Sequence, residues 1–356
     1  MKAIIIAGGL GTRLRPLTYN VPKPIVPLAN KPFVFHQIEL LRKFGIKEVI
    51  LNLHYLSDNI KNIFGDGEKL GVKIYYSIEE HPLGTAGAVK NAEKYFDNDP
   101  MIIFNGDILT DINLEKMIKF HDEKKAKVSI ALTVVEDPTS YGLVICDKND
   151  RVTEFREKPS WEHVIANTIN AGIYIADPGI FKLVPKNKEF SFERQLYPTL
   201  LEKGEKIYGY VTDAYWMDIG NPAKYLRAHR DILNGDVMAN IPGNKISANI
   251  WVEDDVNISD SAKVKGPALI GSHCKIAEDV LLEEYVVLGD SVTIGKGAKL
   301  KNCVVHGQTI INEGSRIEGA VIGSHCTIEE LSTISGASVI ADGSIIKKGT
   351  RIGGML

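Results

Sequence analysis

Over the first two-thirds of the chain, short apolar runs alternate with stretches in which apolar residues recur every three or four positions. The short runs predict β-strands at 3–7, 48–53, 72–77 and 101–105. The periodic stretches predict helices at 33–44, 57–64, 86–95 and 113–124, and Ser57 and Thr85 are expected to cap the second and third. Such alternation favours an α/β domain with a Rossmann-like mixed, mostly parallel sheet and helices on both faces.

The pattern then changes to four strand-like runs, at 128–135, 141–147, 151–157 and 169–176, with little helical periodicity between them. We expect these runs to form an antiparallel or mixed insertion that covers the sheet. Two further helices are predicted, one at 192–203 with Ser191 as its cap and one from Pro222 to about residue 233.

The last third of the chain has an aliphatic residue every six positions, with two one-residue deletions. Three six-residue units make one triangular turn of a left-handed parallel β-helix (hexapeptide repeats), in which the aliphatic side chain points inward. The sequence therefore predicts an α/β domain at 1–233, an Asn- and Gly-rich linker at 234–250 and a β-helix domain at 251–356. The inward positions are Ile258, Val264, Ile270, Ile276, Leu282, Leu288, Ile294, Leu300, Val305, Ile311, Ile317, Ile322, Ile328, Ile334, Ile340, Ile346 and Ile352.

The composition and charge of the chain argue against nucleic acid and membranes as partners. The 356 residues carry a net charge of −3, so there is no general basic field for nucleic acid. No apolar run approaches the roughly 20 residues of a membrane span, and the four cysteines form no C-x-x-C pair, which favours reduced thiols and a cytoplasmic location. The β-helix favours a homo-oligomer that associates through this domain.

Glycines and cations cluster directly after the first predicted strand. Glycine lets backbone N–H groups face one concavity, and a guanidinium can bind two phosphate oxygens at once. Leu14 stands where a dinucleotide fingerprint needs its third glycine, and no Walker Gly-Lys-Ser/Thr is present. The cluster therefore predicts a loop that holds a phosphate chain. Its members are Gly8, Gly9, Gly11, Thr12, Arg13 and Lys23.

Two acidic residues follow strand-like runs and precede turns. Asp107 lies in Asn105-Gly106-Asp107 after an apolar strand, and Asp218 lies in Trp216-Met217-Asp218-Ile219-Gly220. Carboxylates at the carboxyl ends of strands, opposite a phosphate loop, suit Mg²⁺, which takes oxygen ligands and bridges to substrate phosphates. We expect both aspartates to hold Mg²⁺.

Taken together, these motifs resemble the sugar-phosphate nucleotidyltransferases. The resemblance covers nearly the whole chain and includes the C-terminal hexapeptide repeats. Within that family, 80–87 (EHPLGTAG) and 216–220 (WMDIG) look most like the mannose-1-phosphate guanylyltransferases, which make GDP-mannose. The motifs that carry the family resemblance are Gly8-Gly9-Leu10-Gly11-Thr12-Arg13-Leu14-Arg15-Pro16-Leu17-Thr18, Pro22-Lys23-Pro24, Asn105-Gly106-Asp107, Glu157-Lys158-Pro159 and Asn170-Ala171-Gly172.

The resemblance implies substrates, a reaction and roles. A nucleoside triphosphate and a sugar-1-phosphate would react by Mg²⁺-assisted in-line displacement, and pyrophosphate would leave. The glycine loop would hold the triphosphate, Arg13 would stabilise charge on pyrophosphate, and Lys23 would contact the attacked phosphate or its neighbours. Lys158 would bind the sugar-1-phosphate. The sugar hydroxyls would contact Glu157, Asn170 and the backbone of Gly142, and the base would lie near Glu79, Glu80 and Gly84.

The adjacent carboxylates of Glu79 and Glu80 favour guanine, because its N1–H and amino group are two donors. Three alternatives stay open. The base and sugar could be those of a glucose-1-phosphate thymidylyl- or uridylyltransferase. The β-helix could carry an acyltransferase that uses His273, His306 or His325. The chain could also be a non-catalytic homologue that binds nucleotide-sugar and regulates a partner.

Overall fold

The computed structural model describes residues 1–353, which form two compact units. The first comprises residues 1–10 and 37–216, and the second comprises residues 11–36 and those from 217 onward. Segment 11–36, which we expected inside the α/β domain, therefore groups with the C-terminal part of the chain.

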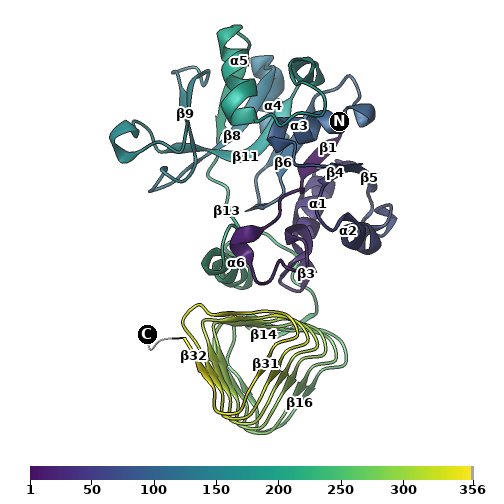
Figure 1. Cartoon of the computed structure of the whole chain (residues 1–356), viewed down its shortest axis with the longest axis vertical. Coiled ribbons are helices and arrows are strands. Elements are labelled where there is room, and N and C mark those ends of the chain that lie inside the picture. Colours follow the sequence, from purple (N-terminus) through teal and green to yellow (C-terminus); the bar gives the residue numbers. More distant parts are fainter. Residues whose placement is uncertain (354–356) are drawn as a thin grey trace. The chain divides into compact units, whose positions relative to one another are not determined.

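The first unit is built on a nine-stranded sheet with β1 (Ala3–Ile6) near its middle (Figure 1). Strand β1 pairs in parallel with β4 (Glu48–Leu53) and β6 (Met101–Asn105), and β4 pairs in parallel with β5 (Lys73–Ile78). The apolar runs of β1, β4 and β6 are almost fully buried, as strands covered on both faces must be, whereas β5 at the edge is partly exposed. The predicted parallel part of the sheet is confirmed.

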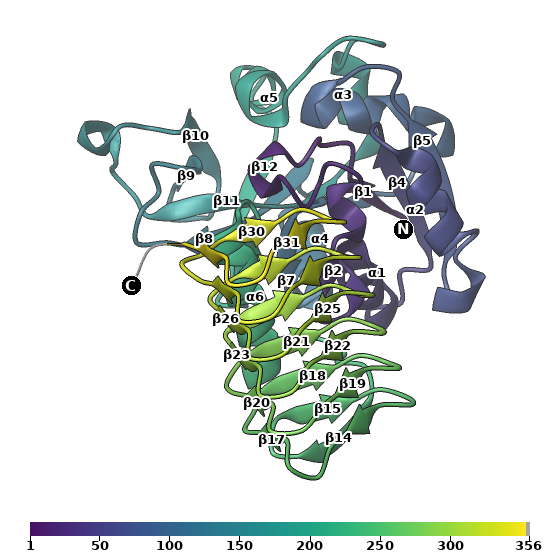
Figure 2. The ribbon, with the colours of Figure 1, turned by 60° about the horizontal axis from the view of Figure 1, so that its bottom comes forward.

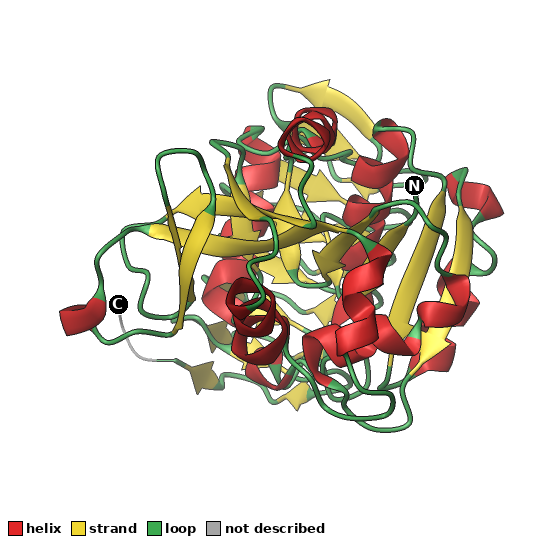
Figure 3. Cartoon of the chain, turned by 90° about the horizontal axis from the view of Figure 1, so that it is seen from above, coloured by secondary structure: helices red, strands yellow, loops and turns green. Residues whose placement is uncertain are grey.

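Helices cover this sheet, as Figure 3 shows in red against the yellow strands. They are α1 (Phe33–Lys43), α2 (Ser57–Phe64), α3 (Gly84–Asn91), α4 (Leu114–Lys124) and α5 (Tyr197–Glu202). Ser191 caps the π-helical turn Phe192–Leu196 before α5, as expected. The caps predicted at Ser57 and Thr85 are wrong, because both residues lie inside their helices and neither helix has a side-chain cap.

The later strands extend the same sheet rather than cover it, which corrects our expectation of a covering insertion. Strand β11 (Thr168–Ala176) pairs antiparallel with both β6 and β8 (Val128–Val134). The sheet continues through β9 (Gly142–Cys146) and β10 (Val152–Glu157) on one side and β12 (Ile207–Val211) on the other. Strand β11 is buried over most of its length and so belongs inside the sheet.

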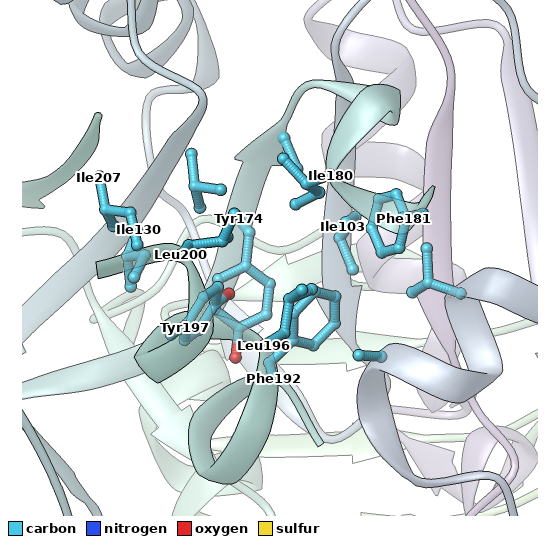
Figure 4. Close-up of a cluster of buried hydrophobic side chains, with 14 of the residues drawn as sticks. Ile103, Ile130, Tyr174, Ile180, Phe181, Phe192, Leu196, Tyr197, Leu200 and Ile207 are labelled. Carbon is cyan, nitrogen blue, oxygen red and sulfur yellow. The ribbon is translucent and has the colours of Figure 1, made fainter. Parts of the chain in front are cut away.

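Aromatic side chains pack β11 against the Phe192–Leu196 turn and α5 (Figure 4). Tyr174 and Phe192 have ring centroids 5.2 Å apart, and Phe192 stacks on Tyr197 at 5.3 Å. All three rings are fully buried, so this cluster fixes the position of the Phe192–Leu196 turn against the strand.

The second unit contains the β-helix, whose strands stack coil upon coil in three sheets (Figure 2). Every predicted inward aliphatic residue is buried in, or packed against, one continuous apolar core, so the six-residue register is confirmed. The first sheet holds β15 (Ile250–Val252), β18 (Ala268–Ile270), β21 (Val286–Leu288), β24 (Cys303–Val305), β27 (Val321–Ile322) and β30 (Val339–Ile340). The second holds β16 (Asn257–Ile258), β19 (Lys275–Ile276), β22 (Thr293–Ile294), β25 (Ile310–Ile311), β28 (Thr327–Ile328) and β31 (Ile345–Ile346). The third holds β17 (Lys263–Val264), β20 (Leu281–Leu282), β23 (Lys299–Lys301), β26 (Arg316–Glu318), β29 (Thr333–Ile334) and β32 (Arg351–Ile352).

The same unit includes helix α6 (Pro222–Asn234) and a short hairpin, β2 (Pro27–Leu28) with β3 (Lys31–Pro32). Strand β14 (Asn244–Ser247) pairs antiparallel with β15, within the stretch 234–250 that we read as a linker. The two remaining short strands are β7 (Ile108–Thr110) and β13 (Trp216–Asp218). Among residues 1–353, no helix has the length and apolar character needed to cross a bilayer.

Candidate active site

The end of β1 and Asp107 lie together at the carboxyl edge of the parallel sheet. The Gly106 N–H donates to the Ile6 carbonyl at 2.9 Å, and a Cβ on Gly106 would lie only 2.5 Å from that oxygen. Glycine at 106 therefore allows the turn that carries Asp107 to rest on the strand leading to Gly8. The expectation that these two motifs share one edge holds for residues 1–10 and 105–107.

Gln37 fixes this turn and was missed by the sequence analysis. Its Nε2 donates to the Asn105 carbonyl at 2.9 Å and to the Ile108 carbonyl at 2.8 Å, on either side of Asp107. The side chain is buried on α1. A polar residue on the apolar face of a predicted helix was the available signal, because a buried amide there needs partners.

Glu79 lies beside the glycine loop, whereas Glu80 is exposed. Glu79 is 6% exposed, and its Oε1 would be 3.1 Å from a Cβ on Gly8. Its Oε2 accepts the Leu83 N–H at 3.1 Å. Burial raises the pKa of Glu79, opposed by that hydrogen bond and by His54 and His81. Glu79 is thus a buried edge residue of this loop, not a solvated one.

Gly84 has a structural reason to be glycine. Its φ is +69°, and a Cβ there would lie 2.9 Å from the Phe190 carbonyl oxygen. The Phe190 N–H donates to the Leu83 carbonyl at 2.9 Å, so the start of α3 packs tightly against this loop. That packing positions the segment that carries Glu79 and Glu80.

The residues expected to face the sugar come together on β9, β10 and β11. Gly142 pairs with Glu157, and a Cβ on Gly142 would be 3.1 Å from Glu157 Oε2 and 3.8 Å from the Asn170 Cβ. Partial desolvation raises the pKa of Glu157, Glu193 adds to the rise, and Lys158 and Arg194 oppose it. Lys158 follows with a φ of +48° and an exposed side chain.

Tyr174 and Glu193 accept hydrogen bonds from the Asn170 side chain. The sequence did not predict either residue as part of the site. Asn170 Nδ2 donates to the Tyr174 hydroxyl at 2.9 Å and lies 3.3 Å from Glu193 Oε1, while its Oδ1 accepts the Gly172 N–H at 2.9 Å. Glu193 Oε2 also accepts from Ser191 Oγ at 2.7 Å and from Thr85 Oγ1 at 3.3 Å. An acidic residue is ordinary at the start of a predicted helix, so nothing in the pattern distinguishes Glu193.

The rest of the predicted phosphate loop lies in the second unit. Gly11 has a φ of +62°, and a Cβ there would be 3.1 Å from the Lys23 Cβ and 3.1 Å from Thr18 Cγ2. Thr18 Oγ1 donates to the Gly11 carbonyl at 2.8 Å. Residues Thr12–Leu14 and Lys23–Ile25 are short 3₁₀ turns. Close packing at Gly11 thus brings the Lys23 backbone to the loop that carries Arg13.

Arg13 and Asp218 both flank Gly220. A Cβ on Gly220 would be 3.2 Å from Arg13 Nη1 and 3.1 Å from Asp218 Oδ2. Asp218 also forms an ion pair with Lys224 on the first turn of α6. Lys224 is a further cation of this cluster that the sequence analysis did not predict.

Asp107 in the first unit and Asp218 in the second each offer a carboxylate, the kind of ligand that a divalent cation takes. Both are carboxylates at the ends of strand-like segments, and hard cations prefer such ligands. Within residues 1–353, no three His, Cys, Asp or Glu side chains gather into a site that the protein alone could complete. A divalent cation at either aspartate would therefore need further oxygen ligands, which bound phosphates could supply.

Comparison with known proteins identifies the class. The family model described as "Nucleotidyl transferase" matches residues 2–235, and that described as "EIF2B subunit epsilon LbH domain" matches residues 247–352. The chain belongs to the nucleotidyl transferase family and is an enzyme with a C-terminal left-handed β-helix. Enzymes of this family generally depend on a divalent metal.

Among its relatives, mannose-1-phosphate guanylyltransferases predominate. The Mycobacterium tuberculosis enzyme of that name is 36% identical over 303 residues, covering 85% of this chain and 83% of the relative. A UTP–glucose-1-phosphate uridylyltransferase from Synechocystis sp. is 33% identical over 88% of this chain and 89% of the relative. The crystal structure of HddC from Yersinia pseudotuberculosis complexed with GMP-PN is 34% identical, with a TM-score of 0.55, and covers 64% of this chain and 97% of HddC.

Proposed function

We propose that the chain transfers a guanylyl group from GTP to mannose-1-phosphate and so produces GDP-mannose and pyrophosphate. Membership of the family supports nucleotidyl transfer to a sugar phosphate, and the prevalence of guanylyltransferases among the relatives supports the particular substrates. The observation that carries the proposal is the edge of the first sheet, where Glu79 lies against Gly8 and the turn that carries Asp107 rests on the end of β1.

In this proposal, the triphosphate lies on the loop that begins at Gly8. Backbone N–H groups of Gly8, Gly9 and Gly11 and the Thr12 hydroxyl bind its oxygens, and Arg13 and Lys23 compensate its charge. Asp107 and Asp218 would hold Mg²⁺, which when bound withdraws charge from phosphate oxygens. Near the base, Glu79 offers a buried carboxylate, and Glu80 and Gly84 complete that part of the site.

The sugar-1-phosphate binds through Lys158, with its hydroxyls on Glu157, Asn170 and the Gly142 backbone. Its phosphate oxygen is already an anion and attacks the α-phosphorus in line, so no side chain needs to remove a proton. Arg13 stabilises the charge that develops on the departing pyrophosphate. The principal barrier is electrostatic repulsion between two polyanions, which Arg13, Lys23 and Lys158 reduce. We expect this reaction in the cytoplasm and in a homo-oligomer that associates through the β-helix.

Uridylyl or thymidylyl transfer to glucose-1-phosphate is the second candidate, favoured by the Synechocystis relative. The two candidate functions are distinguished by measuring pyrophosphate release from GTP, UTP and dTTP by the purified protein, with each of mannose-1-phosphate and glucose-1-phosphate. We expect GTP with mannose-1-phosphate to give the largest kcat/KM. Turnover of UTP or dTTP at least equal to that of GTP would contradict the guanylyl assignment.

Substitution of Gly142 by Ala tests the proposed contacts with the sugar-1-phosphate. The new methyl group would lie 3.1 Å from Glu157 Oε2, so Glu157 must shift where the sugar is expected. We expect the KM for sugar-1-phosphate to rise about five- to tenfold, because misplaced polar contacts weaken binding. The KM for the nucleotide should stay within about twofold and acts as the internal control. Equal changes in both KM values would argue against the sugar assignment.

A further inference from the structure

The hairpin that follows Lys23 has an unusual tip. Its turn residues Ala29 and Asn30 have φ values of +47° and +58°, and Leu28 and Ala29 are 0% exposed. Hairpin tips normally lie in solvent, because their backbone polar groups need partners. Here the partners come from α6 and from the β-helix, all within the second unit.

The tip is held by hydrogen bonds from both sides. Asn30 Nδ2 donates to Glu253 Oε1 at 3.0 Å and to the Leu288 carbonyl at 2.9 Å, both on the β-helix. The Ala29 N–H donates to His229 Nδ1 on α6 at 3.3 Å.

A buried tyrosine links the hairpin to a β-helix histidine. Tyr225 on α6 donates its hydroxyl hydrogen to the Pro27 carbonyl, and His306 Nε2 lies 3.0 Å from the same hydroxyl. Because the tyrosine hydrogen is used, His306 must donate through Nε2–H, which a neutral imidazole can do. His306 is 6% exposed, and burial lowers its pKa to about 4, so the neutral form predominates near neutral pH.

Directional hydrogen bonds act beside close packing where the hairpin meets the β-helix. A pocket of about 220 Å³ opens between them, lined in part by Pro27, Asn30, His229, Val304 and His306. Beside this opening the apolar contacts are less complete than in a closed core, so the hydrogen bonds carry more of the positional constraint. Loss of a directional bond should therefore let the hairpin move.

The hairpin and α6 both lead to the nucleotide loop. Lys23 precedes β2 by four residues and packs its Cβ where Gly11 leaves space. Helix α6 begins beside Asp218 and carries Lys224 and Tyr225 in its first turn and His229 about one turn later. A shift at the tip would thus reach Lys23 through the hairpin and Asp218 through the helix.

We propose that His306 and Asn30 are positioning residues, through which the β-helix fixes the hairpin and so the cations that bind the nucleotide triphosphate. The inference rests on the proposed nucleotide role of Lys23 and Arg13, but not on the identity of the base. It gives the β-helix a part in nucleotide affinity, separate from any role in association.

The test compares His306→Phe with His306→Gln in the full chain. Phenylalanine fills the ring space but cannot donate, whereas glutamine keeps a neutral donor. We expect His306→Phe to raise the nucleotide KM about fivefold, the usual effect of one lost hydrogen bond, and to change the sugar-1-phosphate KM less than twofold. His306→Gln should restore most of the nucleotide KM. His325→Phe is the matched control, since His325 is an exposed histidine on the next coil of the β-helix, and should change neither value.

Asn30→Ala gives a second measurement should His306→Phe fail to fold, and we expect the same selective rise. Equal increases in both KM values, no increase, or failure of glutamine to restore affinity would overturn the inference. The nucleotide used is whichever the wild-type protein turns over best, and its Kd by calorimetry is measured in parallel. Wrong base specificity would therefore contradict the proposed function without affecting this comparison.

Discussion

Asp107→Asn is expected to lower kcat about a thousandfold, and Asp218→Asn to do the same, with the fold unchanged. Asparagine keeps the shape of each side chain and removes the negative charge that a divalent cation needs. Gln37 holds the carbonyls beside position 107 through the backbone, so that turn should keep its geometry in the variant. At position 218, the ion pair with Lys224 is lost as well, so the free energy of unfolding of this variant is measured in parallel.

The measurement is pyrophosphate release under saturating substrates, repeated over a titration of Mg²⁺ and Mn²⁺. Both variants should need a higher metal concentration for half-maximal rate, which a merely distorted site would not require. Asp260→Asn, a change at an exposed aspartate of the β-helix, is the matched control and should behave as wild type. Full activity in either variant would remove that aspartate from the metal site.

The β-helix could be predicted almost residue by residue because its period is local. Each coil repeats the same short pattern, so the inward position of Ile294 or Ile328 follows from its place in the count. The linker was less predictable. Polar composition indicated an irregular segment at 234–250, yet Asn244–Ser247 finds a partner strand in β15. Such pairing depends on a neighbour that composition does not reveal.

The second half of the nine-stranded sheet was also only partly predictable from local patterns. The runs that became β8 and β11 were recognised as strands, but their place in the sheet depends on long-range pairing with β6. A local pattern does not distinguish a strand that extends a sheet from one that covers it.

Short contiguous motifs could be recognised in the sequence, whereas the residues that support them from other elements could not. Gly142, Glu157 and Asn170 come together as expected. Gln37 and Glu193, which hold the backbone and side chains behind the site, come from helical segments where their types are unremarkable. Which residue can support a site depends on where its partner lies in the fold. When that partner is distant in the sequence, local spacing does not predict it.

Two buried histidines, His229 and His306, give the second large prediction, a loss of stability in acid. Burial lowers the pKa of His306 to about 4, and the Asp342 carboxylate opposes this. Burial lowers the pKa of His229 to about 3, the neighbouring His306 and His36 lower it further, and the Pro27 carbonyl opposes. Burial also lowers the pKa of His36 itself.

In the unfolded chain, each histidine has a pKa near 6.5, so between that value and the folded pKa the unfolded state binds more protons. Stability therefore rises with pH across this window, and acidification below pH 6.5 destabilises the fold.

For every unit that the pH falls between 6.5 and the folded pKa, each buried histidine should lower the free energy of unfolding by about 1.4 kcal/mol. From pH 6.5 to 4.5, the pair together should remove about 5 kcal/mol. Carboxylates also titrate in this range, so the decisive quantity is a difference between proteins. His306→Gln, which stays neutral, should lose about 2 to 3 kcal/mol less than wild type over the same interval. Urea unfolding at pH 6.5, 5.5 and 4.5 measures this, with His325→Gln as the control at an exposed site. Parallel loss in wild type and His306→Gln would show that His306 does not bind its proton on unfolding, and would contradict the neutral, buried state from which its contact with Tyr225 is argued.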